Sequence, residues 1–124
     1  MKYSDLQVWQ KAIDLVVEVY SLAKDLPQEE KFALTSQMRR AAVSIPANIA
    51  EGHGRKATNA FLNHLSIANG SLVELETLIE IARRLGYLDG QRANHVRDTT
   101  AEIGRMLNGL KGSLNPRSPS SRTS

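Results

Sequence analysis

The sequence of 124 residues has no cysteine and no apolar run long enough to cross a bilayer. The lack of cysteine excludes a disulfide framework, a thiolate nucleophile and a cysteine zinc site. The lack of a long apolar run excludes a transmembrane helix, and Met1 to Leu6 has no apolar region of the kind found in signal peptides. These absences predict a cytoplasmic protein without membrane contact.

The charge of the chain is small and unevenly distributed. The formal net charge is +3, with an acidic excess in residues 1–30 and 57–82 and a basic excess in residues 31–56 and 83–112. In an antiparallel bundle this alternation places unlike charges on neighbouring helices. The pattern therefore favours charge complementarity within the fold over a uniformly basic surface.

The stretch 37–55 carries polar residues that a plain amphipathic helix would not need. Spacings of three and four place five of them in one stripe on a helix, namely Gln37, Arg40, Ser44, Asn48 and Glu51. An apolar stripe beside it predicts the face that enters the core, namely Leu34, Met38, Ala41, Ile45 and Ile49. The polar stripe is therefore expected at the edge of the core, in a structural role first.

Proline and glycine interrupt this helix. Pro46 removes one backbone hydrogen bond and predicts a kink without a break, since the periodicity continues on both sides and Ser44 offers a hydroxyl to a freed carbonyl. Gly52 and Gly54 are expected to end the helix. Glu74, on the next helix, is expected to pass close to Arg40 and to form an ion pair that sets helix register.

Periodicity predicts four helices and an all-α, antiparallel up-down-up-down four-helix bundle over residues 1–112. Ser4 and Gln7 form a capping box for the first helix, and the second runs from about Phe32 to Glu51. Thr58 or Asn59 starts the third helix, which Gly86 ends, and Asp89 starts the fourth, which reaches about Lys111. Gly70 predicts a close helix crossing, and Ser113 to Ser124 is expected to be a disordered tail.

The first and third helices carry more apolar residues than one buried face needs. The predicted core row of the first helix is Leu6, Trp9, Ile13, Val16, Tyr20 and Ala23, with a second row at Val8, Ala12, Leu15, Val19 and Leu22. A neighbouring copy is therefore expected to cover Val8, Leu15, Val19, Leu22, Leu62, Val73 and Leu78. On this assignment Val19→Asp dissociates the subunits without unfolding them.

The histidines and glycines of the sequence do not form the motifs of known enzymes or metal sites. His53, His64 and His95 lie on separate elements, and none belongs to the Glu-x-x-His pair that a di-iron bundle requires. Neither a nucleophile elbow nor a phosphate-binding glycine loop occurs in the sequence. The sequence therefore predicts a protein without catalytic activity, cofactor, metal or small-molecule substrate.

Several short segments carry a family resemblance over roughly residues 3–110, namely Leu6–Ala12, Leu26–Pro27, Gln37–Gly52, Phe61, Ala68–Ser71, Glu74–Glu76 and Leu85–Leu88. Together they resemble the four-helix-bundle proteins encoded within intervening sequences of bacterial 23S ribosomal RNA genes, often labelled ribosomal-protein-like. The resemblance implies an antiparallel bundle, often a homopentamer, without known enzymatic activity. The same superfamily includes the accessory bundle of diversity-generating retroelements, a pentameric barrel that binds nucleic acid and reverse transcriptase.

Two functions follow from these observations. The first is an oligomeric, non-enzymatic module associated with ribosomal RNA or other nucleic acid, with candidate contacts at Arg39, Arg40, Arg55, Lys56, Arg92 and Arg97. The second is a protein-binding scaffold whose arginines only form intrabundle pairs and a soluble rim. The motif residues expected to be structural are Gln37, Arg40, Ser44, Pro46, Asn48, Glu51, Gly52 and Glu74.

Overall fold

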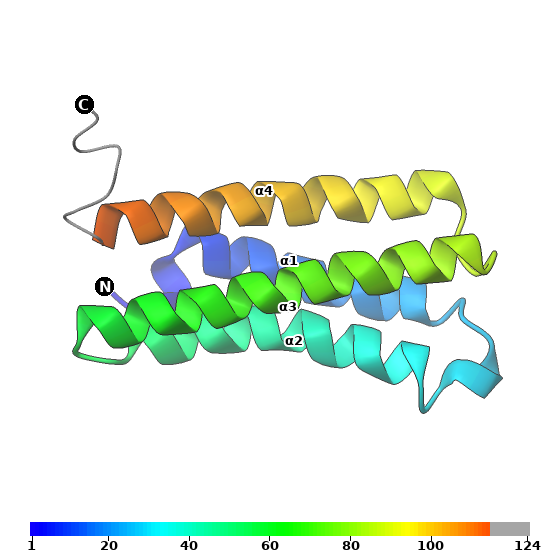
Figure 1. The fold of residues 1–124 in the computed structure, drawn as a ribbon, viewed down its shortest axis with the longest axis horizontal. Helices are drawn as coiled ribbons and strands as arrows, with labels where there is room; N and C mark the ends of the chain where they lie inside the picture. The colour runs from blue at the N-terminus through cyan, green and yellow to red at the C-terminus, as the bar shows by residue number, and fades with distance from the viewer. Residues whose placement is uncertain (115–124) are drawn as a thin grey trace.

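A computed structural model of the chain describes residues 1–114 and shows a bundle of four helices (Figure 1). The long helices are α1 (Gln7–Ala23), α2 (Leu34–His53), α3 (Thr58–Arg84) and α4 (Gly90–Leu114). Short 3-10 turns, η1 (Tyr3–Asp5) and η2 (Gln28–Glu30), precede α1 and α2. Consecutive helices run in opposite directions, and α1 also packs against α4. The predicted all-α bundle is confirmed.

One aliphatic core fills the space between the helices. Its largest fully buried side chains come from all four of them, namely Leu15, Val19, Leu22, Met38, Ile45, Ile49, Leu65, Leu75, Ile79, Val96, Ile103 and Leu107. Each such Leu, Ile or Met stabilises the fold by about 1.5–3 kcal/mol relative to an exposed side chain. The apolar stripe predicted for α2 is buried in the structure.

The buried face of α1 is the second apolar row, which lies beside the predicted one. Val8, Ala12, Leu15, Val19 and Leu22 are buried, whereas in the predicted row only Ala23 is buried, and Trp9 and Tyr20 lie at the rim or in solvent. Both rows have helical spacing, so periodicity alone does not choose between them. The aliphatic row includes the small Ala12, which lets neighbouring helices approach, while Trp9 and Tyr20 have polar tips that need hydrogen-bonding partners.

The capping residues predicted from the sequence are correct for two helix ends and wrong for a third. Gly86 has a φ of 84°, and Tyr87 N donates to the Ala82 carbonyl at 2.9 Å, which closes α3 as predicted. Asp89 accepts a hydrogen bond from Arg92 N at 2.8 Å and begins α4 as predicted. The Ser4 capping box is wrong, because residues 3–5 form η1 and the chain is extended at Leu6 before α1 begins.

Three further expectations concern α2, α3 and the tail. Helix α2 continues through Pro46 to His53 without a break, so Gly52 lies inside the helix and does not end it. Gly70 does not mark a crossing within the chain, because no other helix comes within 4 Å of the place that a Cβ would occupy. Helix α4 extends to Leu114, so residues 113 and 114 are helical, and the rest of the expected disordered tail (115–124) lies outside the described residues.

Candidate functional site

The polar stripe of α2 joins α2 to α3 through a chain of hydrogen bonds. Asn48 Nδ2 donates to the carbonyl and to the hydroxyl of Ser44, at 2.9 and 3.0 Å. The hydroxyls of Ser44 and Ser71 share a hydrogen bond of 2.8 Å, and Asn48 Oδ1 lies 3.0 Å from His64 Nδ1. Since Oδ1 has no hydrogen, His64 Nδ1 is the donor. The Ser44 hydroxyl thus binds side chains of the network, and the predicted bond to a carbonyl freed by Pro46 is not formed.

Gly52 allows the two helices to approach at this point. A Cβ at residue 52 would lie 2.6 Å from His64 Cβ and 3.0 Å from a ring carbon of Phe61, so any larger residue would push α3 away. His53 stacks edge-on against the same Phe61 ring, with centroids 5.7 Å apart. Gly52 therefore has a structural role, as the family motif implied, but its role is close packing.

We expect Asn48→Ala to lower the free energy of unfolding by about 1–3 kcal/mol, because His64 Nδ1 would lose its half-buried acceptor. Arg40→Ala is the contrasting variant. Arg40 is exposed and makes no hydrogen bond or ion pair with residues 1–114, so its loss should change stability by less than about 0.5 kcal/mol. Urea denaturation of both variants measures this difference, and equal midpoints would contradict the assignment.

A polar cleft lies on the α2–α3 surface beside this network. It has a volume of about 420 Å³ and is lined by Gln37, Arg40, Ala41, Ser44, Ser71 and Glu74. Arg40 and Glu74 line the same cleft, but their charged groups do not come within ion-pair distance of one another. The prediction that Arg40 and Glu74 form an ion pair is therefore wrong, whereas the prediction that the two residues lie close together is confirmed.

The six cations predicted to contact nucleic acid are distributed over the whole bundle. Arg55, Arg92 and Arg97 form ion pairs with Glu51, Asp25 and Glu80 respectively. Arg39 is half-buried with its guanidinium 5.1 Å from the centre of the Tyr20 ring. Arg40 and Lys56 are exposed and form no ion pair within residues 1–114. Nucleic-acid contact by these six residues stays a prediction.

A group of unpaired cations lies at one end of the bundle. The N-terminus, the α2–α3 turn and the end of α4 meet there, at the left of Figure 1. Within the described chain, none of four basic side chains at this end forms an ion pair, namely Lys2, Lys56, Arg105 and Lys111. We call these four residues the basic end. Only Lys56 among them was a predicted nucleic-acid contact, because the four residues are far apart in the sequence.

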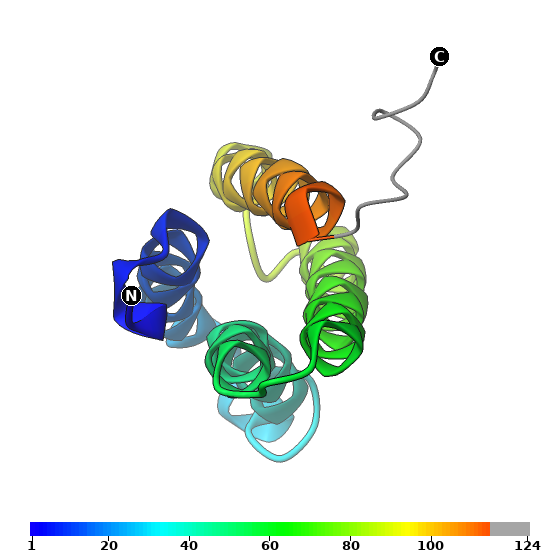
Figure 2. The same cartoon turned by 90° about the vertical axis from the view of Figure 1, so that its left-hand side faces the viewer.

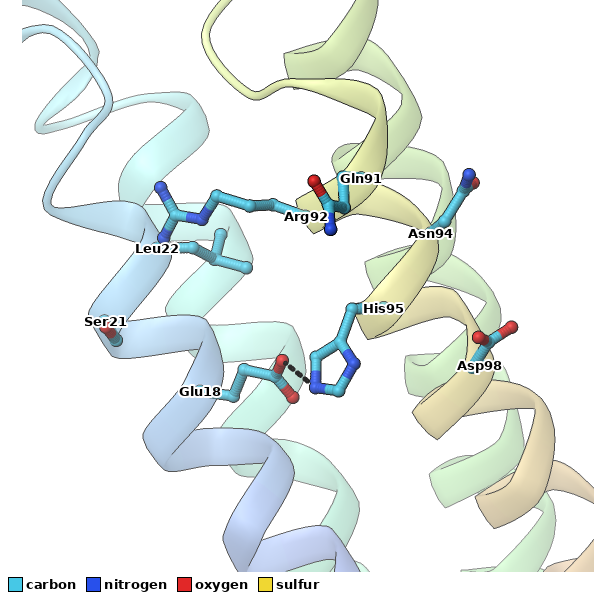
Figure 3. A pocket seen from close by; sticks show the side chains of 8 residues that line it. All are labelled: Glu18, Ser21, Leu22, Gln91, Arg92, Asn94, His95 and Asp98. Carbon is cyan, nitrogen blue, oxygen red and sulfur yellow. Dashed lines mark ion pairs between the residues drawn. The ribbon is translucent and has the colours of Figure 1, made fainter.

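The seam between α1 and α4 is held by three ion pairs in antiparallel register. Lys11, Glu18 and Asp25 follow one another at intervals of seven residues and pair with Glu102, His95 and Arg92. A cleft of about 870 Å³ opens along this seam. Figure 3 shows Glu18 and His95 pointing toward one another across it, 3.0 Å apart, while Asn94 and Asp98 point away from α1. The charges that face each other in this cleft are thus already paired.

Glu80 is the electrostatic link between α3 and α4. Its carboxylate binds Arg83, Arg84 and Arg97 at 2.7–2.9 Å. The hydrogen bonds from Arg83 and then Arg84 are the main causes that lower the pKa of Glu80 from 4.5 to about 2. The same contact raises the pKa of Arg83. These three arginines are therefore committed to one carboxylate.

The low pKa of Glu80 predicts part of the acid sensitivity of the fold. Its contribution to stability is fully present above pH 4.5 and is lost as the pH falls toward 2, because the unfolded chain binds the proton more readily. Glu80→Gln should therefore flatten the dependence of the unfolding free energy on pH between about 4.5 and 2. Urea titrations at several pH values measure this slope. Glu29→Gln, at an exposed carboxylate, should leave it unchanged.

Two opposite sides of the bundle expose apolar side chains. On α1, Val17 is 66% exposed and Tyr20 is 41% exposed; on α2, Val43 is 41% exposed, one turn along from the Arg39 that lies over the Tyr20 ring. On α3, Ile67, Val73 and Ile81 are each more than 40% exposed. Figure 2 shows α1 and α3 on opposite sides of the bundle. We call these surfaces the α1 face and the α3 face.

The structure changes which residues are available for contact with a neighbouring copy. Val8, Leu15, Val19, Leu22 and Leu78 belong to the core, so they are unavailable to a neighbour, and Leu62 is half-buried. Of the seven predicted residues, only Val73 is exposed. Val19→Asp would therefore place a charge in the core, and the expectation that it spares the fold is wrong.

Within residues 1–114, no group of three His, Asp or Glu side chains is placed to hold a metal ion. None of the helices described is long and apolar enough to cross a membrane.

Comparison with known proteins agrees with this fold. A family model described as 23S rRNA-intervening sequence protein matches residues 4–109, which include all of α1, α2 and α3 and most of α4. A crystal structure from Bacteroides thetaiotaomicron VPI-5482, of a protein with unknown function from the S23 ribosomal protein family, matches with a TM-score of 0.78 and 28% sequence identity. The match covers 84% of this chain and 97% of that one. No curated protein matches the sequence.

Proposed function

The chain belongs to the family of 23S rRNA-intervening sequence proteins, and on that premise we propose that it is a non-enzymatic, self-associating module that binds structured RNA. The observation that supports RNA binding is the basic end. Lys2, Lys56 and Lys111 lie at or near that end on three parts of the chain, and Arg105 lies nine residues before the end of α4 at Leu114, all without carboxylate partners among residues 1–114. Phosphate groups are the natural counterions for such unpaired cations.

Four cations on one subunit form a weak phosphate-binding surface. Non-specific contacts of this kind give dissociation constants of about 10⁻⁴–10⁻⁶ M at physiological salt, even with more charges. Self-association would present several basic ends together, and binding through several of them raises the overall affinity by about 10²–10⁴. The proposal therefore joins RNA binding to assembly.

The two apolar faces support assembly. They differ in composition and lie on opposite sides of the bundle, so contact between two copies would join the α1 face of one to the α3 face of the next. Such a heterologous contact repeats and closes into a ring when the rotation per subunit divides a circle. The family resemblance favours five subunits. The open space beside Gly70, between the exposed Ile67 and Val73, suits the close approach of a neighbour's helix.

A protein-binding scaffold is the second candidate function. The internal pairing of Arg55, Arg92 and Arg97 favours it, because these arginines have carboxylate partners and need no phosphate. In this case the apolar faces would bind a different protein. The scaffold predicts no affinity for RNA, so RNA binding separates the two functions.

RNA binding is tested with the purified full chain and a fluorescent stem-loop derived from ribosomal RNA, followed by anisotropy. At about 50 mM salt the proposal predicts saturable binding that weakens as salt increases, because phosphate contacts are strongest when few ions compete. An absence of binding at this salt concentration would refute the RNA function and favour the scaffold.

A further inference from the structure

Two clefts on the bundle differ in how their charges are satisfied. In the larger one, between α1 and α4, Glu18 pairs with His95 and Arg92 pairs with Asp25, so a ligand would have to displace existing contacts (Figure 3). In the smaller one, between α2 and α3, Arg40 and Glu74 pair with nothing in residues 1–114. The smaller cleft is therefore the one with unused binding capacity.

The unlike charges of the α2–α3 cleft lie on different helices. Arg40 belongs to α2 and Glu74 to α3, and their separation exceeds ion-pair distance. Elsewhere on the bundle, six other cationic side chains form an ion pair with a carboxylate, together with His95. Arg40 and Glu74 are thus two unlike charges held apart across a hollow of about 420 Å³.

The serine pair adds a hydrogen-bond donor to this cleft. Ser44 and Ser71 share one hydrogen bond, which uses one of their two hydroxyl hydrogens. Asn48 donates to the Ser44 hydroxyl oxygen, so this contact uses neither of the two serine hydroxyl hydrogens. Whichever serine donates to the other, one hydroxyl hydrogen remains free beside Arg40. Asn48 binds Ser44 and is itself bound by His64, so these two residues fix the position of the serine pair.

We propose that this cleft binds a small zwitterion of the α-amino acid class. The guanidinium of Arg40, which matches a carboxylate bidentately, and the free serine hydroxyl bind the carboxylate. The carboxylate of Glu74 binds the ammonium group from the opposite side. The volume lies at the small end of the range of about 300–1,000 Å³ that is usual for ligand pockets, which suits an amino acid. This binding goes beyond the proposed RNA function and differs from the sequence expectation of no small-molecule ligand.

Saturation-transfer difference NMR with glycine, L-alanine, L-serine and L-glutamate tests the proposal on the full chain. The proposal predicts saturable binding of at least one of them. Propionate lacks the ammonium group and ethylamine lacks the carboxylate, so each should bind at least about tenfold more weakly, which is the effect of one lost charge-assisted hydrogen bond. Absence of saturation by every amino acid, or equal binding of propionate, would overturn the proposal.

Variants then locate the site. Arg40→Gln and Glu74→Gln should each weaken binding by about tenfold or more, and Ser71→Ala by a smaller factor. Lys24→Gln removes an exposed cation next to the end of α1 that forms no ion pair within residues 1–114, and it should leave the affinity unchanged. Circular dichroism checks that each variant is folded. Unchanged binding in both cleft variants would place the ligand elsewhere and overturn the assignment, whatever the outcome of the RNA experiment.

Discussion

Val19→Asp will unfold the protein, whereas Val17→Asp, only two residues away, will leave it folded and separate its subunits. Val19 is fully buried and Val17 is 66% exposed on the α1 face. Among residues 1–114 no cation is buried in the aliphatic core to pair with a carboxylate, so Val19→Asp should cost about 4 kcal/mol or more. Val17→Asp puts the charge at the proposed subunit contact, where only the assembled protein buries it.

Circular dichroism and light scattering distinguish the two results. Val19→Asp should lose the helical signal or its cooperative melting. Val17→Asp should keep both, and its mass should fall from a multiple of 13.7 kDa to the mass of one chain. Val73→Asp, on the α3 face, should behave in the same way as Val17→Asp. A native Val19→Asp protein would contradict the assignment of the core, and an unchanged mass in both surface variants would contradict the contact.

Removing charge from the basic end should have the second largest effect. We expect the double variant Lys56→Gln/Lys111→Gln to bind RNA about 100-fold or more weakly at low salt, because each subunit of the assembly loses two of its four cations. Both side chains belong to the basic end and neither forms an ion pair in residues 1–114, so the fold should be unaffected. Anisotropy titrations at about 50 mM salt measure the change.

A matched control removes the same charge from the other end of the bundle. Lys24 and Lys31 follow α1 at the opposite end and also form no ion pair among the described residues. Lys24→Gln/Lys31→Gln changes the net charge equally, so it should weaken binding only through general electrostatics. Equal losses in the two double variants would show that position is irrelevant and that the basic end is not the contact surface.

The sequence predicted the fold well because the helical period repeats clearly. The stripe from Leu34 to Ile49 became a buried face as expected. The prediction for helix α1 failed because two apolar rows lie side by side on it. Amphipathic spacing shows that a row lies on one side of a helix, but it does not show which of two such rows is buried. Packing decided the choice, by burying Leu15 and Val19 and leaving Tyr20 to stack on Arg39.

The candidate site was less predictable, because it depends on side-chain placement. Helical spacing correctly placed Ser44 and Asn48 in one stripe, but the bond from His64 spans 16 residues and the bond from Ser71 spans 27. Likewise, Arg97 was predicted to contact nucleic acid, and its ion pair with Glu80 on the preceding helix could not be predicted from the sequence. Charge along the sequence indicates which helices attract each other, whereas unpaired charge is visible only after folding.

The dependence of RNA affinity on salt tests the central proposal most directly. The logarithm of the binding constant falls with the logarithm of salt concentration by about 0.9 for each duplex phosphate contacted. The four cations of one basic end therefore give a slope no steeper than about −4. If the assembly contacts RNA through several basic ends, the native protein has a steeper slope than this. The slope of Val17→Asp should then be no steeper than about −4. A native slope near zero, or no binding at all, would contradict the account.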